Sequence, residues 1–214
     1  MTPRLILATA NAGKASELAV LLGDLGYAIV SLRDLGDVQL PPEGETSYRD
    51  NALEKARTTA RATRGAVAVG DDSGLEVDAL GGRPGVASAR FGGPGLTDAE
   101  RVTRLLAEVG PIAARRARFR CVLALVAPWG EEAVVEGLVE GVLTDHPRGT
   151  GGFGYDPIFL IPALGQTFGE LPAIEKDRLS HRARAAVAAR PVLSRWAVRL
   201  RHHPRIPRRG ALVI

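Results

Sequence analysis

Apolar and polar positions along the chain predict alternating strands and helices in its first third. Residues 4–8 form a short, leucine-rich apolar run typical of a buried strand, and residues 15–22 carry leucines at helical spacing. Residues 27–31 predict a second strand, and Ser47 is placed to cap a helix that continues to about Thr63. Strand, helix, strand and helix in this order indicate an α/β fold.

The middle of the chain adds strands that pair directly with each other. Residues 117–127 and 133–142 are strand-like runs separated by the turn signal Pro-Trp-Gly-Glu, which predicts an antiparallel hairpin. A capping-box pattern at residues 97–100 begins a helix to about Val109, whose apolar stripe indicates a packing role. Because a hairpin is inserted among alternating strands and helices, we expect α/β with a mixed sheet.

Two adjacent aspartates interrupt a strongly apolar run. Residues 66–69 lead through a glycine to Asp71 and Asp72, and burying two carboxylates in the middle of a strand is costly. We therefore expect both acids at the end of a strand. Ser73 and a glycine-rich stretch to Gly93 follow, so that the backbone can turn and approach a ligand closely. The sequence predicts the edge of an active site here.

The loop before the first helix, residues 9–14, also suits a ligand. It places backbone N–H groups and Lys14 at a helix N-terminus, which favours phosphate. The P-loop pattern GxxxxGK[ST] is absent, so that phosphate binding and an ordinary strand-to-helix turn both remain open on geometry alone.

A second glycine-rich loop, residues 149–157, surrounds Phe153 and would permit a flat ring to enter. Farther on, Ser180 is placed to cap a helix that begins with His181 and Arg182, which fixes two hydrogen-bond donors at a helix start. Both segments are candidates for binding an aromatic, polar ligand.

Lysine is rare in this chain. Of 28 lysines and arginines only three are lysines, at positions 14, 55 and 176. An ammonium is a compact point charge and a guanidinium a broad planar fork, so we expect the lysines at sites that do not accept the exchange. For Lys55, which lies four residues after Asn51 on one helix face, a surface pair and a role in a cleft both remain open.

Composition supports a globular protein without disulfides. A chain of 214 residues with 45% hydrophobic and 24% charged residues can form one domain or two lobes sharing a sheet. The single cysteine, Cys121, lies in an apolar run, which fits a packed side chain or a reduced compartment. The N-terminal apolar run is too short for a secretory or membrane segment, so we expect a cytoplasmic protein and no membrane partner.

Positive charge is concentrated towards the C-terminus. The formal net charge is +4, and ten arginines lie between positions 178 and 209. Apart from Trp196 the region lacks interleaved aromatic residues, and it has no nucleic-acid motif, which makes a solvated helix face and tail a better interpretation than nucleic-acid binding. We expect one domain over residues 1–189 and a basic extension over residues 190–214, comprising the end of the last helix and a tail.

Five segments, taken together and in this order, resemble the inosine triphosphate pyrophosphatase family, which hydrolyses noncanonical purine nucleoside triphosphates. They are TANAGK at residues 9–14, DNALEKA at 50–56, GDDSGLEVDALGGRPGVASARFGG at 70–93, GGFGYDPIF at 151–159 and EK…SHR at 175–182. The resemblance covers about residues 4–189. It implies two lobes around a long mixed β-sheet with flanking helices, an active-site cleft between the lobes, and a homodimer.

The resemblance also implies an activity and residue roles. ITP, dITP and XTP would be hydrolysed to the monophosphate and pyrophosphate with Mg²⁺, which cleanses the nucleotide pool. Asp72 would bind the metal and accept a proton, with Asp71 and Lys14 as the other catalytic residues. The second metal ligand would be Glu43 or Glu45, of which we favour Glu43. The substrate-binding residues would be Thr9, Ala10, Asn11, Ala12, Gly13, Lys14, Lys55 and Ser73 on the phosphate side, and Phe153, Gly154, Tyr155, Asp156, Lys176, His181 and Arg182 around the base.

Hydrogen-bond polarity suggests how the base would be chosen. Hypoxanthine and xanthine present an acceptor at position 6, where His181 and Arg182 would donate, whereas adenine would leave these donors unpaired. One alternative is a Maf-like pyrophosphatase acting on pyrimidine or modified nucleotides. A nucleotide- or RNA-binding protein is a further alternative, which Asp71 and Asp72 oppose because they would repel phosphate without a metal.

Overall fold

A single seven-stranded sheet forms the centre of the computed structural model, which describes residues 2–36, 38–111 and 115–202. The strand order is β2-β1-β3-β4-β5-β6-β7. The strands are β1 Arg4–Ala8, β2 Ala28–Ser31, β3 Val67–Val77, β4 Arg116–Val126, β5 Glu132–Leu143, β6 Phe159–Ile161 and β7 Gln166–Thr167. β1 pairs in parallel with β2 and β3, and the other neighbours are antiparallel. The predicted mixed α/β sheet and the predicted hairpin, β4 with β5, are confirmed.

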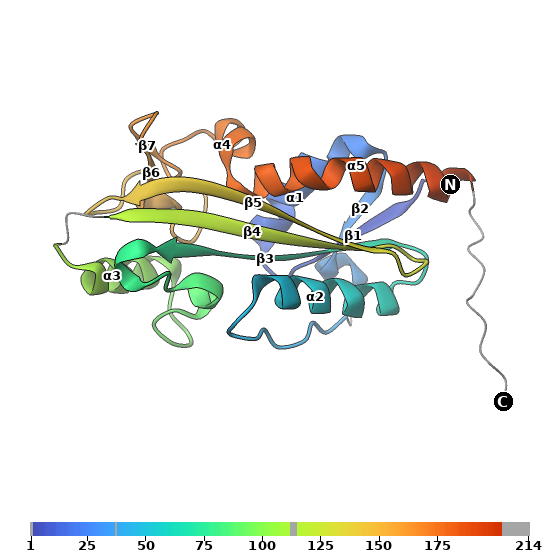
Figure 1. Ribbon diagram of the computed structural model, residues 1–214, viewed down its shortest axis with the longest axis horizontal. Coiled ribbons are helices and arrows are strands. Elements are labelled where there is room, and N and C mark those ends of the chain that lie inside the picture. The colour runs from blue at the N-terminus through green and yellow to red at the C-terminus, as the bar shows by residue number, and fades with distance from the viewer. Residues whose placement is uncertain (1, 37, 112–114, 203–214) are drawn as a thin grey trace.

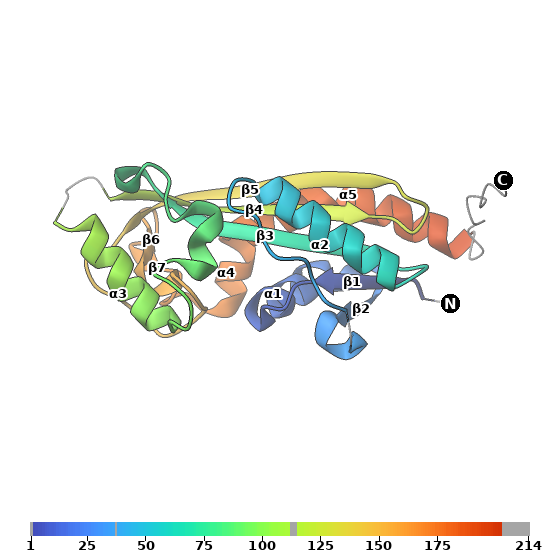
Figure 2. The ribbon, with the colours of Figure 1, turned by 90° about the horizontal axis from the view of Figure 1, so that it is seen from below.

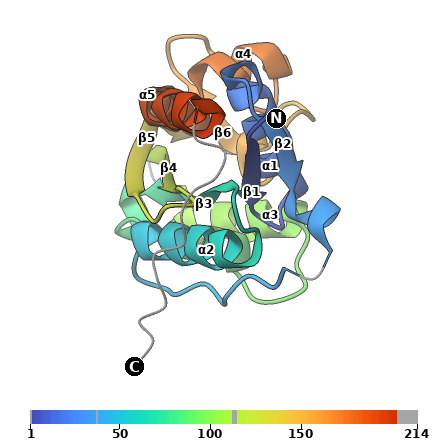
Figure 3. The same cartoon turned by 90° about the vertical axis from the view of Figure 1, so that its right-hand side faces the viewer.

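Helices cover both faces of the long strands. They are α1 Ala12–Leu22, α2 Tyr48–Ala62, α3 Asp98–Val109, α4 Ala173–Leu179 and α5 His181–His202, with short 3₁₀ helices η1 Gly23–Leu25, η2 Leu32–Leu35, η3 Asp78–Leu80, η4 Gly85–Arg90 and η5 Asp156–Ile158. α1 and α5 lie on one face and α2 on the other (Figures 1 and 3). The alternation of β4 explains the layers: Cys121 and Leu123 pack into the α1/α5 core, whereas Val122 and Ala124 pack against α2.

The long strand β3 passes through two hydrophobic cores. Val67 and Val69 at the start of β3 belong to the core with α1 and α5, whereas Leu75 and Val77 at its end belong to a second core. That second core also holds the buried stripe of α3 and the phenylalanine cluster around Phe159. α2 and α3 accordingly lie towards opposite ends of the long strands (Figure 2). The two lobes therefore share strands, as the resemblance implied.

The expectation that Asp71 and Asp72 end a strand is wrong. β3 continues through both residues to Val77, with Asp71 opposite Leu123 and Asp72 opposite Val122 of β4. It is the parallel neighbour β1 that ends, at the level of Gly70. The carboxylates thus lie where one side of β3 loses its partner, and their burial is compensated by cations from other segments.

Three predicted helix caps are confirmed, whereas α1 begins at Ala12, three residues before the run predicted for it. Ser47 Oγ accepts a hydrogen bond from the Asp50 amide at 3.1 Å, Thr97 forms the capping box of α3, and Ser180 Oγ accepts one from the Ala183 amide at 3.1 Å. Each cap fixes the first turn of a helix that carries residues of the predicted site or packs beside it.

The last helix runs past the expected start of the basic extension. α5 continues through residue 190 to His202, and Leu193 and Trp196 are buried in the α1/α5 core. The Tyr27 hydroxyl donates to the Leu193 carbonyl at 2.7 Å. This part of the extension is packed helix; residues 203–214 of the expected tail lie outside the described residues. Within the described chain, no helix has both the length and the apolar character needed to cross a bilayer.

Candidate active site

Asp71 is held between two cations. Its side chain is fully buried, with Lys14 Nζ 2.7 Å from Oδ1 and Arg182 Nε 2.9 Å from Oδ2. Ser73 Oγ donates to Oδ1 at 3.2 Å. Burial alone would raise the pKa of the Asp71 carboxyl, but Arg182 and Lys14 hold that pKa well below its usual range. Asp71 is therefore a charged carboxylate that ties the first helix to the last.

Asp72 points to a different set of partners. Lys55 Nζ lies 3.0 Å from Asp72 Oδ1, and Asn51 Nδ2 donates to Oδ2 at 3.0 Å. Burial raises the pKa of Asp72 above its ordinary value, although Lys55 opposes this effect. Adjacent acids thus have opposite pKa shifts, because Asp71 faces two cations and Asp72 shares one.

The close approach of α2 to β3 brings these partners to Asp72. A Cβ atom on Gly70 would lie 2.1 Å from the carbonyl oxygen of Ala52, so only glycine permits this packing. Asn51 and Lys55, one helical turn apart on α2, are consequently buried against β3. Of the two roles left open for Lys55, its placement favours the cleft.

The same lysine joins Asp72 to the acidic loop, residues 43–46, which carries Glu43 and Glu45. Lys55 Nζ lies 2.5 Å from Glu43 Oε1, so the Glu43 and Asp72 carboxylates converge on one ammonium. Burial would raise the pKa of Glu43, but Lys55 outweighs it and lowers that pKa. Glu45 is exposed, and none of the described ion pairs involves it. The structure therefore brings Glu43, and not Glu45, beside Asp72.

Glu43 and Asp72 fit a magnesium ion. Mg²⁺ prefers oxygen ligands and is commonly bound through one or two carboxylates together with substrate phosphates. In the described residues no group of three or more His, Cys, Asp or Glu side chains could hold a metal by itself. Two converging carboxylates would therefore supply the protein ligands to such an ion, and substrate oxygens and water would complete its coordination.

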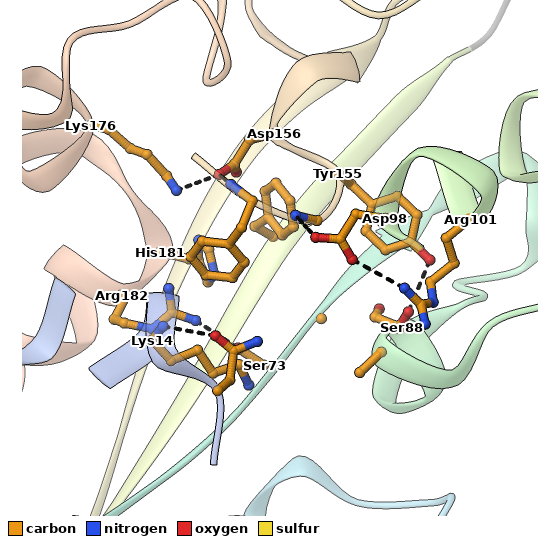
Figure 4. A pocket seen from close by; sticks show the side chains of 16 residues that line it. Lys14, Ser73, Ser88, Asp98, Arg101, Tyr155, Asp156, Lys176, His181 and Arg182 are labelled. Atoms are coloured by element: carbon orange, nitrogen blue, oxygen red, sulfur yellow. Dashed lines mark hydrogen bonds and ion pairs between the residues drawn. The ribbon is translucent and has the colours of Figure 1, made fainter. Parts of the chain in front are cut away.

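A chain of alternating charges connects the acids to the second glycine-rich loop. Lys176 Nζ bonds Asp156 Oδ2 and lies 2.7 Å from Glu17 Oε1, while Arg182 bonds the other oxygen of Glu17. The order along this chain is Asp156, Lys176, Glu17, Arg182, Asp71 and Lys14. Figure 4 shows the Lys176–Asp156 pair on one side of the pocket and the group of Lys14, Arg182 and Ser73 below it. All three lysines of the protein form ion pairs at this site, as the scarcity of lysine predicted.

Phe153 contacts the phosphate-binding loop candidate. A Cβ atom on Gly13 would lie 2.6 Å from Phe153 Cδ1, so glycine is needed for this contact. Lys176 Nζ lies 4.7 Å from the ring centroid, within cation–π range. Asp156 Oδ2 accepts a hydrogen bond from the Phe153 amide at 2.8 Å and thereby fixes the loop. Phe153 thus joins the two arms of the site, which are the loop at residues 9–14 and the second glycine-rich loop at residues 149–157.

We expect Gly13→Ala to lower kcat/KM by about tenfold, because the added methyl group must displace Phe153. Nucleotide turnover and thermal unfolding should be measured together, since the predicted loss is in substrate use rather than in folding. Gly23→Ala is the matched control, as a Cβ atom there meets nothing within 4 Å. Equal kcat/KM values for the two variants would contradict the coupling.

His181 and Arg182 are placed differently from each other. His181 is buried, stacks on Phe119 with a centroid distance of 4.7 Å, and has a pKa lowered well below its ordinary value by burial. It is therefore neutral. Arg182 donates to Asp71, Glu17 and, at 2.8 Å, Ser73 Oγ, so each of its three nitrogens has a protein acceptor.

One pocket gathers most of the predicted substrate-binding residues. Its lining includes the predicted residues Asn11, Lys14, Ser73, Phe153, Gly154, Tyr155, Asp156, Lys176, His181 and Arg182, together with Gly74, Ser88, Ala89, Asp98, Arg101 and Phe119. Thr9 Oγ1 accepts a hydrogen bond from the Asn11 amide at 3.2 Å and shapes the loop, whereas Ala10 and Ala12 are exposed. Asn11 Oδ1 accepts from the Lys14 amide at 3.0 Å and caps α1.

The structure adds residues that the sequence analysis did not select. Glu17 lies three residues after Lys14, a spacing that could have placed both on one helix face. Asp98 Oδ2 accepts a hydrogen bond from the Gly154 amide at 2.8 Å, so α3 does more than pack (Figure 4). Asn51 and Arg90 both contact the acidic loop. No signal in one sequence indicates the contacts of Asp98 and Arg90, which join segments far apart in the chain.

Comparison with known proteins identifies the family. The family model described as the Ham1 family matches residues 5–192. This chain belongs to the Ham1 family. The match extends over nearly the same residues as the resemblance seen in the sequence, which it confirms.

Relatives of this Ham1-family chain include enzymes and solved structures. A Gloeobacter violaceus protein named dITP/XTP pyrophosphatase is 50% identical over 181 residues, which are 85% of this chain and 89% of that protein. The Staphylococcus aureus Ham1 protein has a TM-score of 0.78 at 34% identity, covering 89% of this chain and 97% of its own. A nucleoside-triphosphatase, dITP/XTP pyrophosphatase, from Mycobacterium abscessus has a TM-score of 0.69 at 44% identity, covering 89% and 99%. The two-lobed fold is thus shared with Ham1 proteins.

Proposed function

We propose that this Ham1-family enzyme hydrolyses the noncanonical purine nucleoside triphosphates dITP, XTP and ITP to the monophosphate and pyrophosphate with Mg²⁺, and so cleanses the nucleotide pool. Its curated relatives make it a nucleoside triphosphate pyrophosphatase. The observation that supports the proposal most is the convergence of Glu43 and Asp72 beside a pocket lined by Lys14, Lys176 and Arg182.

In the proposed reaction, Asp72 and Asp71 would have different roles. When bound by Glu43 and Asp72, Mg²⁺ would neutralise phosphate charge and favour the pyrophosphate leaving group. The Asp72 carboxylate would accept a proton from the attacking water. Lys14 and the N-terminal amides of α1 would stabilise negative charge on the phosphates. Asp71, buried between Lys14 and Arg182, would hold both cations in position.

Selection of the base would depend on hydrogen-bond donors near the second glycine-rich loop. Lys176, His181 and Arg182 line the pocket and can donate hydrogen bonds, which suits the 6-oxo group of hypoxanthine or xanthine. Adenine presents an amino group there and would leave a donor unpaired, at a large cost in binding. The Phe153 ring offers a face or an edge to the base.

The test is pyrophosphate release from a panel of nucleoside triphosphates with and without Mg²⁺. We expect kcat/KM for ITP, dITP and XTP to exceed that for ATP by at least about 100-fold. Removal of Mg²⁺ by a chelator should abolish release. Preferential release from dTTP or UTP would support a Maf-like pyrophosphatase instead, and salt-sensitive RNA binding without hydrolysis would support a binding protein.

The assembly remains a proposal that rests on the family resemblance. A homodimer is compatible with β5, whose only pairs with β6 among the described residues are Val142–Leu160 and Leu143–Phe159, so that most of its outer edge is free of strand partners. Light scattering would separate a dimer from a monomer of 22.6 kDa. A cytoplasmic location is also proposed, and cell fractionation would test it.

A further inference from the structure

Between Asp72 and α3, the last 3₁₀ helix, η4, contacts the acidic loop. η4 ends at Arg90, whose Nη1 donates to the Glu43 carbonyl at 2.9 Å and whose Nη2 donates to the Gly44 carbonyl at 3.1 Å. One guanidinium therefore bridges two consecutive peptide groups. A planar fork can make both bonds at once, which a lysine ammonium at the end of a flexible stem cannot reproduce.

Asn51 also binds the acidic loop. Its Oδ1 accepts from the Gly44 amide at 2.8 Å, and its Nδ2 donates to the Gly44 carbonyl at 3.1 Å. The same Nδ2 donates to Asp72 Oδ2 at 3.0 Å. Asn51 is buried, so this one carboxamide sets the loop and the Asp72 carboxylate relative to each other.

η4 is itself anchored close to the acids. Ser88 Oγ accepts from the Leu75 amide of β3 at 2.8 Å and donates to the Gly85 carbonyl at 2.6 Å. The Tyr155 hydroxyl donates to the Ser88 carbonyl at 2.9 Å (Figure 4). η4 is thus braced against β3 and against the base-side loop, and Arg90 extends from a fixed support.

These contacts decide which glutamate faces Asp72. With both peptide groups around Gly44 fixed, the Glu43 side chain reaches Lys55, whereas Glu45 remains exposed. Within the described residues Arg90 forms no ion pair with a carboxylate, and its hydrogen bonds go to the loop backbone. The arrangement is specific for holding this loop.

We propose that Arg90 and Asn51 are positioning residues that clamp Gly44 and thereby hold the Glu43 carboxylate at the metal side of the cleft. Neither residue needs to touch the substrate. The proposal rests on the proposed function for its metal, but the clamp itself is a property of the protein alone and can be measured without nucleotide or Mg²⁺.

The first measurement is proteolysis of the loop. Glu-specific endoprotease would cut after Glu43 or Glu45 when the loop opens, and mass spectrometry would identify these cuts. We expect Arg90→Ala to be cut there about tenfold faster than wild type, because two hydrogen bonds from a charged donor are lost. Arg90→Lys should also be cut faster. Arg57→Ala is the matched control, because it removes a partly exposed arginine that bonds Glu132 and Glu54, away from the loop.

The second measurement separates positioning from general damage. In Arg90→Ala, the Mg²⁺ concentration for half-maximal pyrophosphate release should rise about tenfold, while kcat at saturating Mg²⁺ stays within about twofold of wild type. Arg57→Ala should match wild type in both. Arg90 and Asn51 act on the same Gly44 carbonyl. The double variant Arg90→Ala/Asn51→Ala should therefore raise the Mg²⁺ concentration for half-maximal release by less than the product of the two single fold-changes.

Three results would overturn the clamp: unchanged cutting in Arg90→Ala, faster cutting with an unchanged Mg²⁺ requirement, or rescue of both properties by lysine at position 90. If the wild type releases no pyrophosphate at any Mg²⁺ concentration, the proposed function fails. The proteolysis comparison then decides the clamp alone, with faster cutting at Glu43 or Glu45 in Arg90→Ala supporting it and equal cutting rejecting it.

Discussion

Asp72→Asn is expected to lower kcat for ITP by about 10³-fold while leaving the protein folded. The asparagine keeps the size of the side chain and can still accept from Asn51 or Lys55. It cannot accept a proton from water at neutral pH, and it is a weaker ligand for Mg²⁺. Both losses fall on the chemical step, so kcat should fall far more than binding of the nucleotide.

Single-turnover and steady-state pyrophosphate release would measure the effect. Glu76→Gln is a suitable control, because Glu76 lies on the same strand but pairs with Arg120, 3.0 Å away, outside the pocket lining. It should keep kcat within about threefold, as substitutions outside the site usually have small effects. A kcat for Asp72→Asn within about tenfold of wild type would remove Asp72 from the role of proton acceptor.

Local patterns predicted the elements of this fold well because their causes are local. The capping residues Ser47, Thr97 and Ser180 act within one helical turn, and the turn after β4 closes a hairpin between neighbouring runs. The order of five motifs placed both arms of the site before their geometry was known. What one sequence cannot supply is the distance between those arms.

The wrong strand end shows where local reasoning stops. Asp71 and Asp72 are costly in the middle of a strand only if nothing neutralises them. The neutralising side chains come from α1, α2 and α5, which are separated from the aspartates by up to 111 residues, as for Arg182. Burying a carboxylate is indeed costly, but the cations that offset this cost come from distant parts of the chain. The sequence did not indicate a role for Arg90 either, because its hydrogen-bond partners lie 47 and 46 residues away in the chain.

Three lysines among 28 lysines and arginines proved the most informative compositional signal, because each pairs with a carboxylate in this site. Each ammonium contacts at least one carboxylate. A planar guanidinium could bind the same carboxylate only with a different geometry. Arg182 shows the converse case, because its guanidinium donates from three nitrogens to three different acceptors. The choice of cation at each position therefore follows the shape of its surroundings.

Asp71→Asn is expected to lower the free energy of unfolding by about 3–5 kcal/mol, because it leaves Lys14 and Arg182 without the buried carboxylate between them. The sign follows from the pKa. A carboxyl whose folded pKa is lowered stabilises the fold at neutral pH in its charged form, whereas one whose folded pKa is raised does not. The neighbouring substitution Asp72→Asn should therefore leave stability nearly unchanged.

Thermal unfolding of the two variants makes a direct comparison at adjacent positions. For a chain of this length, the loss in Asp71→Asn corresponds to a Tm lower by about 6–20 °C, and Asp72→Asn should stay within about 3 °C of wild type. Below its Tm, Asp71→Asn should retain measurable turnover with a raised KM, since Lys14 loses its anchor but Asp72 keeps Lys55. Equal shifts in Tm would contradict the division of labour between the acids. A folded Asp71→Asn protein with wild-type KM and kcat lowered as far as in Asp72→Asn would instead show that Asp71 takes part in the chemical step.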